Sequence, residues 1–194
     1  MRSKPMLFKS EMVRAILDGK KTQTRRMASL GLVEGDQIWV RETWRVGSWK
    51  HETRSIALDF CDGPQKKWIR VPAQAKNKDG FDVFKRLAND SLEQSWETLG
   101  IQLAGYKWNA GQGPCKWRPS LFMPKWASRI TLKLIDVKQQ WLRDMTEADA
   151  VAEGFKSLGR FVGYWDAIHS KHFDRQWVSN PTVFVYTFER QETA

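Results

Sequence analysis

Apolar and polar residues alternate in two long stretches of the C-terminal half, and this alternation predicts β-strands. Between residues 127 and 142, Ile130, Leu132 and Leu134 alternate with polar neighbours, which is the period of a strand with one buried face. The segment PTVFVYTFER, residues 181–190, predicts a final strand. Nearer the N-terminus, a Gly-Asp turn precedes another predicted strand within EGDQIWVRETWRV, residues 34–46.

An amphipathic helix is predicted close to the N-terminus. In SEMVRAILDG, residues 10–19, Ser10 can cap the first turn, and Gly19 stands where a helix end favours a left-handed residue. The helix has an apolar face formed by Met12, Val13, Ile16 and Leu17. KPMLF before this helix and KTQTRR after it, residues 4–8 and 21–26, predict two short strands.

Two further helices are predicted between the C-terminal strands. In DMTEADAVAEGF, residues 144–155, Thr146 and Asp149 have the spacing of a capping box, with Asp in place of the usual Glu or Gln. Gly154 is expected to end this helix. The segment FVGYWDAIHSKHF, residues 161–173, predicts the second helix.

The middle of the chain has a different composition and is interpreted as an insertion. Residues from about 47 to 118 are rich in turn formers, with a helical pattern over 82–100 and short strands and loops around it. The elements show no regular βαβ alternation, so we expect an α+β fold, a small β-barrel with short flanking helices. The chain, 1–194, is thus expected to form a single domain. The insertion is rich in tryptophan, with Trp49, Trp68, Trp96, Trp108 and Trp117.

Charge and aromatic content indicate an anionic, planar partner. The 194 residues carry a net charge of +10, and residues 1–30 hold eight basic and only two acidic side chains. The chain has 11 Trp, which suits stacking against a planar ligand as well as core packing. RNA, DNA or a nucleotide fits both features, while simple solubility explains the charge equally well.

The remaining composition favours a cytoplasmic protein without cofactor. Cys61 and Cys115 are far apart and form no CxxC pattern, which fits a reducing compartment. Neither a signal peptide nor a transmembrane run is recognisable, so no membrane partner is expected. His169 and His172 have helical i, i+3 spacing but lack a third ligand nearby, so we expect no metal.

The segment GKKTQTRR, residues 19–26, is the strongest candidate for chemistry. A threonine hydroxyl needs an adjacent base to act as nucleophile, and Lys21 can be that base for Thr24 if its pKa is lowered. Lys20, Arg25 and Arg26 supply neighbouring cations that lower it. Residues three apart on a flat strand point to opposite faces, so a shared site requires a kink near Lys21. A basic strand edge that blocks aggregation is the alternative.

Two other places are candidates. Glu153 precedes Gly154 at a helix C-terminus, where a carboxylate opposes the helix dipole; such local conflicts occur at functional sites as well as on frayed ends. In MPKWASRI, the residues Lys125, Trp126 and Arg129 combine cations with an aromatic ring, which suits a base and its phosphate. A core position for the ring of Trp126 is an equal alternative.

GKKTQTRR resembles the signature of the ASCH domain family within the PUA-like superfamily. The pattern G-x-K-x-x-E/T-x-R is filled by Gly19, Lys21, Thr24 and Arg26. EGDQIWVRETW is similar to the next strand of that family, and PSLFMPKWASRITL resembles ASCH-like proteins of phages and prophages. The resemblance covers about residues 4–46 and 119–190 and implies a small β-barrel that handles nucleic acid or modified nucleosides.

One branch of the family implies a specific activity. Its members are small amidohydrolases that remove the acetyl group from N4-acetylcytidine with a lysine, a threonine and a later glutamate. By motif these residues correspond to Lys21 and Thr24, and TEADAVAEG resembles the glutamate-bearing helix and implies Glu153. Arg26 is then expected to stabilise negative charge, and Trp39 or a tryptophan of the insertion to stack on the base. This chain is much longer than those enzymes.

Other functions fit the same residues. A binding module would recognise RNA or a modified base in the same basic cleft without hydrolysing it. Some ASCH proteins cut RNA, although no histidine lies near this motif to act as acid or base. A phage accessory protein that binds a host protein is a further alternative.

Overall fold

The computed structural model describes residues 1–62, 67–77, 79–100 and 108–191, which fold into two compact units. Unit 1 contains Met1–Met6, Glu11–Val40 and Arg129–Ala194. Unit 2 contains Leu7–Ser10 and Arg41–Ser128, so the region expected as an insertion lies inside it, together with chain on both sides. Each unit has its own sheet.

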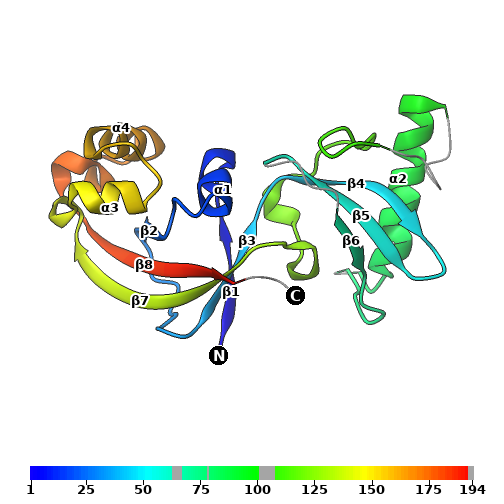
Figure 1. The fold of residues 1–194 in the computed structure, drawn as a ribbon, viewed down its shortest axis with the longest axis horizontal. Coiled ribbons are helices and arrows are strands. Elements are labelled where there is room, and N and C mark those ends of the chain that lie inside the picture. The colour runs from blue at the N-terminus through cyan, green and yellow to red at the C-terminus, as the bar shows by residue number, and fades with distance from the viewer. Residues whose placement is uncertain (63–66, 78, 101–107, 192–194) are drawn as a thin grey trace. The chain divides into compact units, whose positions relative to one another are not determined.

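Unit 1 is built on a five-stranded sheet with the order β1-β3-β7-β8-β2 (Figure 1). Its strands are β1 (Ser3–Leu7), β2 (Gln23–Arg26), β3 (Gln37–Arg41), β7 (Thr131–Trp141) and β8 (Thr182–Gln191). These elements confirm the strands predicted from the alternating patterns. The α+β class is also confirmed, but the described strands form an open sheet with β1 and β2 at its edges, and they do not close into the expected barrel.

Three helices accompany this sheet, namely α1 (Ser10–Leu17), α3 (Glu147–Ala152) and α4 (Leu158–Ile168). The helix α3 has the caps that the sequence predicts, whereas α4 begins and ends earlier than the predicted 161–173. The capping box of α3 is present, because Thr146 Oγ1 accepts from the Asp149 amide and Asp149 Oδ2 accepts from the Thr146 amide. Both α3 and α4 lie over β7 and β8 in Figure 1, and they bury a cluster against β8. This cluster includes Ala150, Phe161, Trp165, Val183 and Val185.

The histidine spacing predicted on the second of these helices is not helical. The helix α4 ends at Ile168, and His169 has a φ of −109° and a ψ of 16° as its C-cap. His172 then precedes a separate short 3-10 turn. The two imidazoles therefore do not share a helix face, because the chain turns between them.

Unit 2 combines a three-stranded antiparallel sheet with one long helix. The strands β4 (Trp44–Lys50), β5 (Ser55–Phe60) and β6 (Lys67–Arg70) follow one another in the order β4-β5-β6, and α2 (Val83–Leu99) is the helix. One face of the sheet carries the core, in which Val46, Ile56 and Leu58 pack with Phe84 and Leu87 of α2. The short strands expected for this region, and the helix expected over 82–100, are thereby confirmed.

Short 3-10 turns connect these elements. They are Ser120–Phe122, Lys125–Ala127, Leu142–Asp144, Phe173–Arg175 and Trp177–Ser179. None of the helices in the described ranges combines the length and apolar character needed to cross a lipid bilayer.

Residues 108–113 are held on the second face of the unit 2 sheet by a buried carboxylate and an indole. Asp59 is fully buried and accepts hydrogen bonds from Arg45 Nε at 2.9 Å and from the amides of Gly111 and Gly113 at 2.6 and 3.0 Å. The indole of Trp108 lies directly on Gly47, where an added Cβ would stand 1.9 Å from Cζ2 of the ring. Gly47 is therefore required for close packing.

Replacement of Gly47 by alanine should destabilise the protein because the new methyl group overlaps the Trp108 ring. We expect Gly47→Ala to lower the free energy of unfolding by about 1–3 kcal/mol, measured by urea denaturation. Gly159→Ala is the matched control, since nothing lies within 4 Å of a Cβ there, and it should be neutral or stabilising. Equal stability of Gly47→Ala and the parent would contradict this packing.

Candidate functional site

The ends of α1 and α3 meet and bring Lys21 next to Glu153. After α1, the amides of Lys20 and Lys21 both donate to Ala15 O, at 2.8 and 2.9 Å, so the chain turns tightly before β2 begins at Gln23. Glu153 is the C-cap of α3. Gly154 follows with a φ of +90°, and a Cβ there would lie 3.1 Å from Ala15 Cβ. A glycine at this position thus allows the two helix ends to approach.

Lys21 and Glu153 form a buried ion pair. The Nζ atom of Lys21 donates to Glu153 Oε2 at 2.6 Å and to the backbone oxygen of Glu153 at 2.8 Å. The two side chains are only 1% and 5% exposed. Because buried charges in a protein are stable only when paired and hydrogen-bonded, each of these two residues fixes the position of the other. The structure therefore joins two predicted catalytic residues that are 132 positions apart.

Arg25 lies on the second oxygen of the same carboxylate. Its Nη1 is 3.3 Å from Glu153 Oε1 and donates to Gln23 Oε1 at 2.9 Å, and its Nη2 lies 3.4 Å from Asp149 Oδ1. The Arg25 side chain is fully buried. Alternation along β2 explains this arrangement, because Gln23 and Arg25 point to one face of the strand.

Thr24 lies at the outer edge of β2, next to a second cation. Its hydroxyl oxygen accepts a hydrogen bond from Arg26 Nη1 at 2.8 Å, and the same nitrogen donates to the backbone oxygen of Arg25 at 2.8 Å. Lys21 Nζ binds the backbone oxygen of Gln23 at 2.7 Å. Carbonyl groups two residues apart point to the same side of a strand. Lys21 and Arg26 therefore bind successive carbonyls on one edge, with Thr24 between these two positions.

This edge arrangement resolves the predicted conflict of strand faces. Lys21 precedes β2, and Thr22 leaves the helical turn with its amide bound to Ala152 O at 2.8 Å. The lysine can thus reach along the strand edge instead of pointing to one face. Lys21 therefore binds the strand that carries Thr24, while Arg26 is the cation bound to the Thr24 hydroxyl.

The electrostatic environment prepares Lys21 to lose its proton. Burial of the ammonium lowers the pKa of Lys21, the ion pair with Glu153 opposes this change, and repulsion from Arg26 and Arg25 adds to it. The net direction is downward. Burial likewise lowers the pKa of Arg26, with Glu153 acting against the shift.

Asp149 balances part of the positive charge. The pKa of this carboxyl lies below its ordinary value: burial raises it, while hydrogen bonds from Thr146 and the charge of Arg25 lower it by more. Within the described residues, the cluster contains three cations and two carboxylates, Lys21, Arg25, Arg26, Glu153 and Asp149. The site is therefore net positive while Lys21 is protonated and both carboxylates are ionised.

The other predicted binding residues lie elsewhere. Lys20 is exposed and paired with Asp18 at 3.0 Å, and Trp39 is buried in β3, which β7 and β8 separate from β2. Lys125 is exposed in unit 2, and Trp126 belongs to the core of that unit, 6.4 Å edge-to-face from Trp44. Arg129 is buried in unit 1. The core interpretation of Trp126 is therefore confirmed.

Sequence reasoning missed one residue of the cluster and two of its neighbours. Asp149 was recognised only as a helix cap, Gln23 was not singled out, and Tyr164 of α4 is an electrostatic neighbour of Arg26. The strand alternation of QTRR could have paired Gln23 with Arg25. Nothing in the local pattern places Tyr164 or Asp149 beside them, because these contacts depend on how α3 and α4 pack.

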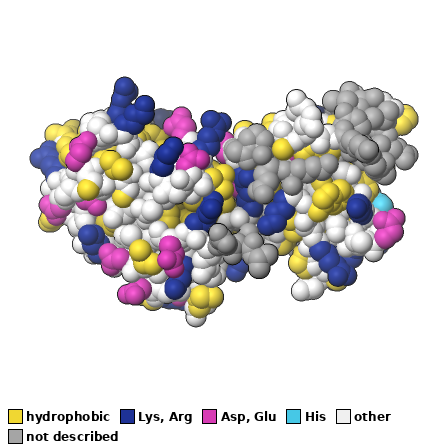
Figure 2. Space-filling view, in the orientation of Figure 1, with side chains coloured by type: hydrophobic (Ala, Val, Ile, Leu, Met, Phe, Trp, Pro, Cys, Tyr) yellow, Lys and Arg dark blue, Asp and Glu magenta, His cyan; other side chains and the backbone are white. Residues whose placement is uncertain are grey.

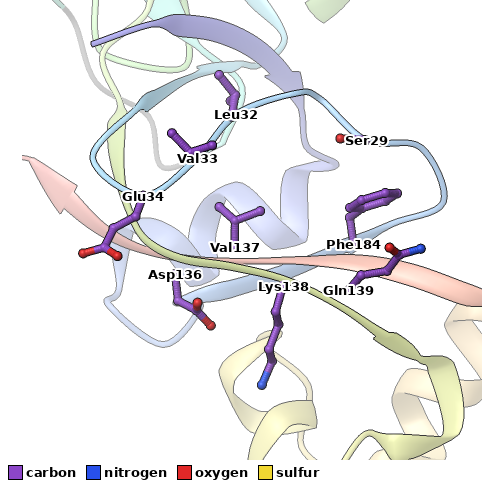
Figure 3. Close-up of a pocket in the computed structure, with 9 residues that line it drawn as sticks. All are labelled: Ser29, Leu32, Val33, Glu34, Asp136, Val137, Lys138, Gln139 and Phe184. Atoms are coloured by element: carbon purple, nitrogen blue, oxygen red, sulfur yellow. The ribbon is translucent and has the colours of Figure 1, made fainter.

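A separate pocket of about 350 Å³ lies on unit 1. Figure 3 shows Glu34 and Asp136 at one end of it and Phe184 and Gln139 at the other. None of the residues predicted for the site lines this pocket. In the parts of the chain that the structure describes, no group of three His, Cys, Asp or Glu side chains could hold a metal ion.

The surface and the comparisons add little to this geometry. Figure 2 shows Lys and Arg side chains on the visible faces of both units, and Asp and Glu lie among them on unit 1. Comparisons with protein-family models, with curated proteins and with solved structures found no match. The chemistry of the site must therefore be argued from its own residues.

The charge count of the cluster predicts an order of stabilities. Lys21→Met leaves two cations facing two carboxylates, whereas Glu153→Gln leaves three cations facing Asp149 alone. Loss of one partner of a buried pair costs about 3–5 kcal/mol, so we expect both variants to be destabilised and Glu153→Gln the more strongly. Urea denaturation at neutral pH measures both; the reverse order would contradict the charge distribution.

Proposed function

We propose that the chain is an amidohydrolase of N4-acylated cytosine nucleosides, of the ASCH type within the PUA-like superfamily. The observation that supports this proposal is the buried Lys21–Glu153 pair at the strand edge that also holds the Thr24 hydroxyl. The proposed fold is a PUA-like arrangement in which the described sheet stays open and unit 2 is an addition. Thr24 is the nucleophile, Lys21 the base, and Glu153 holds the base in place.

The first chemical step is transfer of the acyl group to the protein. Neutral Lys21 accepts the proton of the Thr24 hydroxyl while Oγ1 forms a bond to the amide carbonyl carbon. The tetrahedral adduct collapses as the C–N4 bond breaks, and the proton on Lys21 passes to N4, directly or through Glu153. Water then hydrolyses the threonine ester, with Lys21 again as base, and releases the carboxylic acid.

The lowered pKa of Lys21 supports this role because only the neutral amine can accept a proton. Glu153 has two opposing effects. Its charge raises the pKa of Lys21, while its hydrogen bond fixes the amine and gives the proton a second acceptor. A general base works best when its pKa lies near the working pH, because it must accept a proton in one step and give it up in the next.

Arg26 has the geometry to stabilise the nucleophile. It donates to Thr24 Oγ1 at 2.8 Å, and a cation at this oxygen favours the charge that develops as the proton leaves. Arg26 is also the most exposed of the three cluster cations. Since Thr24 is only 1% exposed, substrate binding must displace covering groups, and movement of Arg26 would uncover the hydroxyl.

A binding module, or a ribonuclease, is the second candidate, favoured by the excess of cations over carboxylates in the cluster. A net positive site attracts phosphate whether or not it carries out catalysis. This candidate differs from the first in its dependence on the threonine hydroxyl, because binding to phosphate does not require a nucleophile.

Hydrolysis of N4-acetylcytidine by the purified protein, followed by absorbance, tests the proposal. We expect turnover that falls by roughly 10²-fold or more in Thr24→Val and in Lys21→Ala, because each removes a partner of the proton transfer. Lys20→Ala is the matched control, because Lys20 is next to Lys21 in the sequence but its side chain is exposed. This variant should keep full activity.

Two outcomes would contradict the proposed hydrolysis. Folded parent protein without turnover would leave the site as a reader of RNA, for which binding against salt is the next measurement. Full activity of folded Thr24→Val would exclude the threonine as nucleophile even if the chain hydrolyses the substrate.

A further inference from the structure

Most of the positive charge of the chain belongs to unit 2, outside the proposed active site. The sequence of this unit contains 16 Lys and Arg and 9 Asp and Glu, a net charge of +7 out of the total of +10. A cationic surface of this kind favours an anionic partner. The location of exposed cations and rings on its sheet indicates where such a partner binds.

The strand register places cations and a tryptophan on the sheet face opposite the core. Ile56 and Ile69 are paired across β5 and β6 and face the core, so the adjacent pairs face the other way. Two rows result from the register of the three strands: Lys50–Ser55–Arg70 and Ser48–Ala57–Trp68. The helix α2 packs against the core face, which leaves this second face to the strand side chains and the loop after α2.

Trp68 has the properties of a stacking platform. Its side chain is 40% exposed on the edge strand β6, and its partners across the sheet, Ala57 and Ser48, are small. Lys50 Nζ lies 4.8 Å from the centre of the indole. A cation therefore lies over the ring, within reach of the phosphate of a nucleotide that stacks on Trp68.

The charge of this face is not neutralised by its own carboxylates. Among the described strand residues of the face, Asp59 is the one carboxylate, and it is fully buried and bound to Arg45. Lys50 and Arg70 are both exposed. At the Arg45 end of the face, Trp117 is 38% exposed, and the guanidinium of Arg45 lies 4.0 Å from the centre of its ring.

We propose that this face of unit 2, formed by Lys50, Trp68, Arg70 and Trp117, binds single-stranded nucleic acid. Flat rings interleaved with exposed cations match a chain of planar bases and phosphates. The exposed large side chains of the face are aromatic, which suits base stacking. The residues of this surface and those of the Lys21–Glu153 site belong to different units.

Fluorescence anisotropy with a labelled 12-nucleotide oligo-dT tests this surface. The oligonucleotide contains no cytosine, and the Lys21→Ala variant tests whether the proposed active site contributes to the signal. We expect binding that weakens with salt, and a loss of roughly five-fold or more in Trp68→Leu, because one base–aromatic stack is removed. Trp68→Phe keeps a π-face and should retain most of the affinity. Lys50→Ala should weaken binding and reduce its salt dependence.

Matched variants separate this surface from general charge and from the active site. Trp96→Leu removes a 62% exposed tryptophan of α2, and Lys85→Ala removes an exposed lysine of the same helix. Lys21→Ala alters the proposed active site. All three variants should bind the oligonucleotide as the parent does. Circular dichroism verifies folding of each variant. Parent-like binding by folded Trp68→Leu, no binding at low salt, or a preference for duplex DNA would overturn the proposal.

Discussion

The buried ion pair between Lys21 and Glu153 is the interaction on which the organisation of unit 1 around its site depends. It joins the start of β2 to the end of α3, and its carboxylate also faces Arg25. A charge buried to this degree is stable only when it is paired, so either residue without the other would destabilise the fold. The pair thus links the stability of the unit to the protonation state of one lysine.

The backbone makes this pair possible at two points. Gly154 allows the end of α3 to approach Ala15 of α1, and the tight turn after Gly19 places Lys21 outside the regular strand. From there the lysine reaches the strand edge, where Gln23 O and Arg25 O offer acceptors to Lys21 and Arg26. The hydroxyl of Thr24 lies at the same strand and accepts a hydrogen bond from Arg26. Unit 2 carries most of the positive charge of the chain.

Local signals in the sequence predicted the elements well and the contacts only in part. Apolar periodicity located α1, β7 and β8, and the capping box located α3, because these depend on neighbouring residues. The motif resemblance named both Lys21 and Glu153 as site residues, and the structure pairs them. The division into two units, the open sheet and the position of Trp39 away from β2 were not predictable, since they depend on strand order. Asp149 and Tyr164 join the site only through helix packing.

The most direct test of this account is the pKa of Lys21 itself. Nitrogen-15 NMR of the lysine side chains, with the Lys21 signal assigned by its loss in Lys21→Met, follows its titration in the parent protein and in Glu153→Gln. We predict a pKa below the ordinary value of about 10.4 and a further decrease in Glu153→Gln, because the carboxylate raises the pKa of Lys21. A Lys21 pKa at or above the ordinary value would contradict its role as base.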